Sequence, residues 1–187
     1  MKFIKYLSIL ITCALLFTMC NQAKNSDATT ESSFKIAMDH AKVWDEAIKQ
    51  VMELADAMPD SMISYKPHDS VRTFAEQLIH IGGSSKVICD LYLKDVPPPS
   101  QNPDMDANAM TKEEIKKWVS EQMSAVKDSI LTMSDEALQE EITSFGGNKM
   151  SRLEGMLTVH DHMTNHKAKA NLYVRISGNQ PPSYRYY

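Results

Sequence analysis

Three of the chain's six histidines lie close together, in the stretch VHDHMTNHKAKANLYVR that spans residues 159–175. If this stretch is helical, His162 and His166 are four residues apart and lie one above the other on the same face. Two imidazoles placed in this way can bind one metal ion, at nitrogen-to-metal distances of about 2 Å. Two buried imidazoles without partners would be costly. The HxxxH pair therefore predicts either a metal site or two hydrogen-bonded core histidines.

A helical wheel shows that the three histidines are not equivalent. His162 and His166 fall on a mostly apolar stripe of the helix expected at about 152–177, so we expect both rings to face the core. His160 is shifted toward the polar edge of the same helix. We therefore expect His160 to be a solvated or rim residue without a part in the site.

A third ligand should come from another helix, and His80 is the strongest candidate. It lies in the middle of a helix expected at about 71–94, within FAEQLIHIGGSSKVI. Ser84 lies one turn further along and Gly83 is beside it, which would leave space near the imidazole. The predicted metal-binding set is thus His80, His162 and His166.

Other polar residues have more than one interpretation. His40 is at the border of an apolar helix face, where a role as fourth ligand is a minor alternative. His68 lies in a loop and is expected to be solvated or to cap a helix. Asp45 and Glu76 could each orient a ligand imidazole, as carboxylates near metal sites do. Ordinary pairing or solvation is the favoured role for both.

The apolar spacing predicts the elements that must position these residues. It indicates four helices, and no alternation typical of a sheet is present. Asp69 or Ser70 is a plausible N-cap for the second helix, and TKEE at Thr111 is a capping box for the third. We expect one short helical turn in SDEALQE and a loop with a short extended piece in FGGNKM. Gly178 predicts the end of the last helix. The fold class is therefore all-α, an antiparallel four-helix bundle, although two loops are long for the simplest up-down order. The expected helices are at about 34–58, 71–94, 111–130 and 152–177.

The N-terminus has the layout of a secretory signal. Lys2 and Lys5 precede an apolar run at residues 6–19 that is too short for a confident membrane span. LLFTMC resembles a bacterial lipoprotein signal in which Cys20 carries the lipid; LITC at Cys13, a plain cleaved signal and an uncleaved anchor are the alternatives. We expect residues 1–20 to be the signal peptide, 21–33 a flexible tether and 34–187 the bundle domain. The protein would be exported and attached to the membrane, on its periplasmic or cell-surface side.

Composition excludes several classes of protein. The whole chain has a formal net charge of −4. Removal of two signal-peptide lysines leaves 18 basic and 24 acidic residues. The sequence has no patch of basic residues interleaved with aromatic ones, the pattern that is typical of nucleic-acid binding. Only Cys89 remains beyond Cys20, so an internal disulfide is excluded for the domain.

Two segments resemble the DinB/YfiT-like family of metal-binding four-helix bundles. They are SVRTFAEQLIHIGGSSKVI, with one histidine after an apolar lead, and HDHMTNHKAKANLYVRISGNQPP, with the HxxxH pair. The resemblance implies that His80, His162 and His166 bind the metal. The sequence departs from the family pattern at the last histidine, where it has HKAK and many members have HRGQ. Some members resemble thiol-dependent S-transferases, an activity that an exported protein would poorly support.

Three histidine ligands leave coordination positions open, which is typical of a catalytic metal site. The first hypothesis is a metal-dependent hydrolase or transferase acting on a small substrate. The second is a lipid-anchored module that binds a metal or ligand without turnover. The ion is divalent, and imidazole suits zinc, nickel, iron and copper alike. The tail PPSYRYY is expected to pack over the bundle, with a partner or homodimer contact as the alternative.

Overall fold

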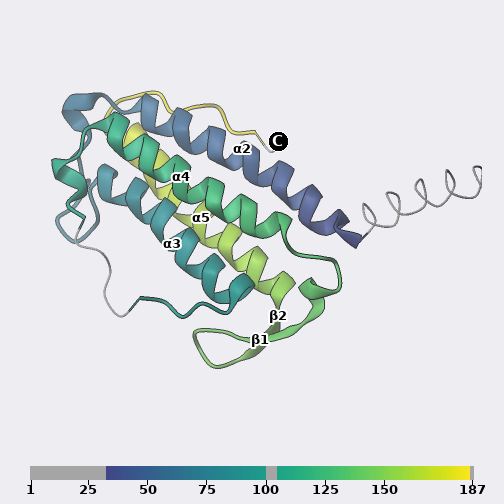
Figure 1. The fold of residues 1–187 in the computed structure, drawn as a ribbon. Coiled ribbons are helices and arrows are strands. Elements are labelled where there is room, and N and C mark those ends of the chain that lie inside the picture. Colours follow the sequence, from purple (N-terminus) through teal and green to yellow (C-terminus); the bar gives the residue numbers. More distant parts are fainter. Residues whose placement is uncertain (1–32, 100–104, 186–187) are drawn as a thin grey trace, which may run out of the picture.

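Four long helices form the protein in a computed structural model that describes residues 33–99 and 105–185 (Figure 1). The all-α four-helix bundle is confirmed. The expected signal peptide and nearly all of the expected tether lie outside the described residues. None of the described helices combines the length and apolar character that a bilayer crossing requires. The helices are α2 (Lys35–Ala57), α3 (Phe74–Lys94), α4 (Lys112–Leu131) and α5 (Arg152–Ile176).

The helices form two parallel and two antiparallel neighbouring pairs. Thr73 Oγ1 donates to Asn108 Oδ1 at 2.8 Å, which joins the N-terminal ends of α3 and α4, so these helices are parallel. Lys112 Nζ donates to Met58 O at 3.1 Å, which joins the start of α4 to the end of α2. The end of α3 and the start of α4 therefore lie at opposite ends of the bundle (Figure 1). This separation explains why the loop is too long for the simplest up-down order.

Capping boxes start three of the four helices. At α4, Thr111 caps the helix and Glu114 completes the box, as TKEE predicts. At α3 the expected caps Asp69 and Ser70 are wrong, because Thr73 is the N-cap. Thr73 and Glu76 have the spacing of a capping box, and both reciprocal hydrogen bonds are present. A third box, formed by Ser151 and Glu154, starts α5.

Short elements complete the fold. The turn expected in SDEALQE is the 3-10 helix η3 (Ala137–Gln139). The extended piece expected around FGGNKM is an antiparallel hairpin, in which Ile142 pairs with Met150. Gly178 follows α5 with a φ of +84°, as expected of a residue that ends a helix. The remaining elements are η1 (Asp60–Met62), η2 (Ala107–Ala109), β1 (Glu141–Thr143) and β2 (Lys149–Ser151).

The core lies between the four helices and is rich in methionine. Met58, Met123, Met156 and Met163 are almost fully buried, consistent with a structural role for these flexible side chains. Trp44 is also fully buried, and its indole Nε1 donates to Met123 O at 2.8 Å. This bond satisfies the only polar group of the indole and joins α2 to α4.

The C-terminal tail packs over the bundle, as expected. It returns along α2 after the end of α5 (Figure 1). Gln50 Nε2 donates to Arg185 O at 3.1 Å. The Arg185 guanidinium donates to Glu46 at 2.6 Å and to Glu53 at 2.7 and 2.8 Å. Both carboxylates belong to α2, so the tail is held on this helix.

The close approach of α3 and α5 at Gly155 generates a prediction. A Cβ at residue 155 would lie 2.8 Å from Tyr92 Cβ, closer than real contacts allow. Gly155→Ala should therefore lower the free energy of unfolding by about 1–3 kcal/mol, although alanine favours helices more than glycine does. Urea denaturation measures the change. Asn165→Ala, at an exposed position of the same helix, is the control and should not be destabilising; equal stability of both variants would contradict the prediction.

Candidate metal centre

The antiparallel packing of α3 against α5 brings His80, His162 and His166 together. One ligand atom from each imidazole lies within 4.8 Å of the other two. The ring centroids are 4.3 Å apart for His80 and His166, 4.6 Å for His162 and His166, and 5.2 Å for His80 and His162. The structure thus places all three predicted site residues at one point between two helices.

His166 is the most buried of the three and is held by Gln77. Its side chain lies next to that of Gln77, with Nδ1 2.9 Å from Oε1. Gln77 Nε2 in turn faces the Tyr173 hydroxyl at 3.5 Å, so Oε1 is the atom that accepts from the imidazole. With Nδ1 protonated, the lone pair of His166 is on Nε2. A hydrogen bond of this kind fixes the tautomer and orientation of a metal-binding histidine.

Gln77 was not predicted as an orienting residue. It lies three residues before His80 on α3 and is 3% exposed. Its position on the same helical line as His80 was the available signal, since a polar residue on a buried face needs a partner.

His80 has a partner on its own helix. Ser84 Oγ is 2.9 Å from His80 Nδ1 and 3.4 Å from Nε2. The sequence placed Ser84 here only as a small residue that leaves space. Its hydroxyl instead hydrogen-bonds the imidazole from one turn away.

His162 provides a test of whether a metal fits. Its Nδ1 is buried and has no hydrogen-bond partner within the structure. A buried polar atom without a partner costs free energy. The atom lies in a group of three imidazoles, the donor type that zinc, nickel and copper accept. The residues present therefore fit a divalent transition-metal ion.

The three imidazoles are neutral at neutral pH. Burial lowers the pKa of His80 to about 3, helped by the nearby positive charge of Arg72. Burial likewise lowers the pKa of His166 to about 4, with smaller contributions from His162, Lys169 and Arg72. The pKa of His162 is also lowered, mainly by burial and then by Lys169. Because only a neutral imidazole has a lone pair to give, these shifts leave the nitrogens ready for a metal.

The set is not closed by a fourth protein ligand. Within residues 33–99 and 105–185, no further histidine, cysteine, aspartate or glutamate joins the three. His40, the alternative fourth ligand, instead contacts His160, with 5.2 Å between ring centroids. His160 itself is half-buried between His40 and Trp44. It is therefore a rim residue, one of the two roles expected for it, and its Nδ1 is buried without a partner.

The other polar candidates have ordinary structural roles. The Glu76 carboxylate accepts from Thr73 N at 2.7 Å and from Asn108 Nδ2 at 3.1 Å. Asp45 accepts from Lys127 Nζ at 2.6 Å. His68 Nδ1 lies 2.8 Å from Ser70 Oγ in an exposed loop. The favoured interpretations of these residues, pairing and local capping, therefore agree with the structure.

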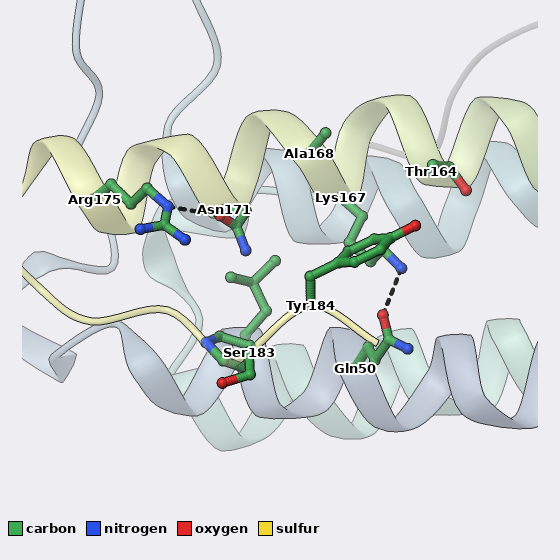
Figure 2. A pocket seen from close by; sticks show the side chains of 10 residues that line it. Gln50, Thr164, Lys167, Ala168, Asn171, Arg175, Ser183 and Tyr184 are labelled. Carbon is green, nitrogen blue, oxygen red and sulfur yellow. Dashed lines mark hydrogen bonds between the residues drawn. The ribbon is translucent and has the colours of Figure 1, made fainter. Parts of the chain in front are cut away.

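Two clefts lie elsewhere, between α2, α5 and the tail. The first, of about 240 Å³, is lined from α5 by Lys167 and Arg175 and from the tail by Tyr184 (Figure 2). Lys167 Nζ crosses this cleft to donate to Gln50 Oε1 at 2.8 Å. The second cleft, of about 480 Å³, shares Lys167 and Tyr184 with the first and reaches His160. Both are bounded by the side of α5 that faces α2, not by the three-histidine side.

Comparison with known proteins identifies the family to which these features correspond. The model of the DinB superfamily matches residues 44–169. This range contains all three histidines of the candidate centre. No curated protein matches the sequence.

Solved structures have the same fold. A DinB-like protein from Bacillus cereus is 14% identical with a TM-score of 0.66, over 82% of this chain and 99% of that one. A DinB-like protein from Bacillus subtilis is 21% identical with a TM-score of 0.63, over 79% of this chain and 98% of that one. YfiT from Bacillus subtilis is 14% identical with a TM-score of 0.56, over 76% of this chain and 87% of that one. It is described as "a probable metal-dependent hydrolase with an unusual four-helix bundle topology". At these identities the likeness shows the fold alone.

The lowered histidine pKa values predict how stability depends on pH. The unfolded chain takes up protons on its histidines below about pH 6.5, whereas folded His166 and His80 do so only near pH 4 and 3. The free energy of unfolding should therefore fall as the pH drops from 6.5 to 4. Urea denaturation of the chelator-treated protein across this range measures the fall. His80→Gln/His166→Gln should show a shallower fall, and parallel curves would contradict this origin of the pH dependence.

Proposed function

Because this chain belongs to the DinB superfamily, we propose that it binds a divalent metal ion through His80, His162 and His166. The observation that carries this proposal is the approach of three neutral imidazoles to within 4.8 Å, one from α3 and two from α5. The unpartnered Nδ1 of His162 supports it, since a metal would give this half-buried ring a partner. Zinc, nickel, iron and copper all suit the three imidazoles.

The chemistry that we propose is hydrolysis or group transfer on a small substrate. Three protein ligands leave positions open for a substrate or water. A divalent metal bound there would supply Lewis acidity, which polarises a carbonyl or phosphoryl group and lowers the pKa of water. The description of YfiT as a probable metal-dependent hydrolase supports the same reaction class.

The surrounding residues have distinct tasks in this proposal. Gln77 holds His166 in the tautomer with a free Nε2, and Ser84 restrains the ring of His80. The positive charges of Arg72 and Lys169 act on the site, as their effects on the histidine pKa values indicate. They would favour a substrate with a negative charge near the reacting group. The lysine at residue 169 belongs to the HKAK segment that departs from many family members.

We also propose that the protein acts outside the cytoplasm, on a lipid anchor at Cys20. The basic start, the short apolar run and the cysteine after LLFTM support this location. The polar segment that follows would give the bundle reach from the membrane surface. An exported location disfavours chemistry that needs a cytosolic thiol.

Metal content tests the site. The purified chain, offered zinc and then dialysed, should bind one more ion per chain than His80→Ala or His162→Ala, because either change removes a ligand. Elemental analysis gives the count. Saturating metal should also raise the melting temperature of the unsubstituted chain, since about 2.7 kcal/mol of stabilisation follows at one hundred times the Kd.

His68→Ala is the matched control, because His68 lies in an exposed loop. It should bind as much metal as the unsubstituted chain. Equal metal content in all four proteins would reject the site. If metal binds as expected, hydrolysis of ester, amide and phosphoester compounds should follow metal content across the variants. Metal binding without turnover would favour the non-catalytic module.

The anchor has its own test. Cys20→Ser removes the only side chain in LLFTMC that can carry the lipid. In bacterial cells the variant should shift from the membrane fraction to the soluble exported fraction, as followed by immunoblotting. Cys13→Ser is the control and should stay with the membrane. A Cys20→Ser protein that remains in the membrane fraction would contradict the lipid anchor.

A further inference from the structure

α5 also presents a histidine on the side away from the candidate metal centre. His160 packs against His40 of α2, with 5.2 Å between ring centroids and 68° between ring planes. The same centroid separation joins His80 and His162 within the three-histidine group. The two imidazoles are thus as close as two that share the candidate centre.

Both rings of this pair have a buried nitrogen without a partner. These atoms are His40 Nε2 and His160 Nδ1. Leaving two such atoms unpaired side by side is unfavourable, because each lost its water on folding and gained no hydrogen bond. His162 Nδ1, in the three-histidine group, is in the same condition. An ion held by both nitrogens would relieve this cost.

Charges of both signs surround the pair. The pair lines the cleft of about 480 Å³, together with the carboxylate of Asp161, the cationic Lys167 and the cationic Arg185. Lys167 donates to the neutral Gln50 and keeps its positive charge, which acts on His160. Arg185 is neutralised by the α2 carboxylates Glu46 and Glu53. Asp161 has no ion-pair partner among the described salt bridges, and its negative charge partly offsets that of Lys167 at His160.

We propose that His40 and His160 form a second, weaker metal site, which takes a transition-metal ion of the zinc, nickel or copper class. Two imidazoles supply the protein ligands, and the cleft supplies room for water or for the Asp161 carboxylate. With one ligand fewer than the three-histidine group, the site should bind at least tenfold more weakly. A bound ion would link α2 to α5, helices whose mutual contacts are fewer than those of α2 with α4.

Zinc titration of the full chain, followed by equilibrium dialysis and elemental analysis, tests the second site. The unsubstituted chain should bind one tight and one weaker ion. His40→Phe and His160→Phe each keep an aromatic ring but lose the ligand nitrogen, so both should lose only the weaker ion. His80→Ala/His162→Ala should lose the tight ion and keep the weaker one.

His68→Phe makes the same change at an exposed histidine and should bind as much zinc as the unsubstituted chain. If both His40→Phe and His160→Phe retain the weaker ion, the second site is rejected. It is also rejected if His80→Ala/His162→Ala binds no zinc while its metal-free melting curve shows it folded. The two proposals can fail separately. If His80→Ala/His162→Ala keeps the tight ion while His40→Phe loses the weaker one, the three-histidine proposal is rejected and the second site stands. The melting curve of each metal-free variant establishes folding, and the two phenylalanine variants provide independent tests if one fails to fold.

Discussion

The contact between α3 and α5 determines what the rest of the protein can do. The two helices approach so closely at Gly155 that a side chain there would overlap Tyr92. Because the helices are antiparallel, this register places the middle of α3 opposite the histidine-bearing turns of α5. His80 then meets His162 and His166 without any contribution from a loop. The site is therefore built on rigid elements, which hold ligands more accurately than loops do.

Burial gives the three imidazoles their chemical state. A histidine in water is partly charged near neutral pH, and three charged rings so close together would repel one another. The bundle removes this difficulty by taking the rings out of water, which lowers the pKa of each one. Gln77 then selects one tautomer for His166. The same packing that stabilises the fold thus prepares lone pairs for a metal.

The sequence predicted what helical period and local signals determine. It gave the four helices, the TKEE cap, and the inward orientation of His162 and His166. It also identified His80, because a histidine pair on one helix calls for a partner on another. It could not give the direction of α4 relative to α3, since the long connection between these helices permits either a parallel or an antiparallel arrangement. It could not show that His160 has His40 of α2 beside it, because the wheel describes one helix. Gln77 was missed for the same reason: its partner is 89 residues away.

The parallel arrangement of α3 and α4 has a consequence for how the chain folds. Among helices that follow each other in sequence, α3 and α4 pack extensively but are parallel, whereas α2 and α3, and likewise α4 and α5, share few contacts. The antiparallel packing joins α2 to α4 and α3 to α5, which are each separated by another helix in the sequence, so these helices do not form simple helical hairpins between sequence neighbours. Native contacts must therefore close long stretches of chain, which raises the contact order above that of an up-down bundle. This protein should fold more slowly than a simple up-down bundle of the same length and stability.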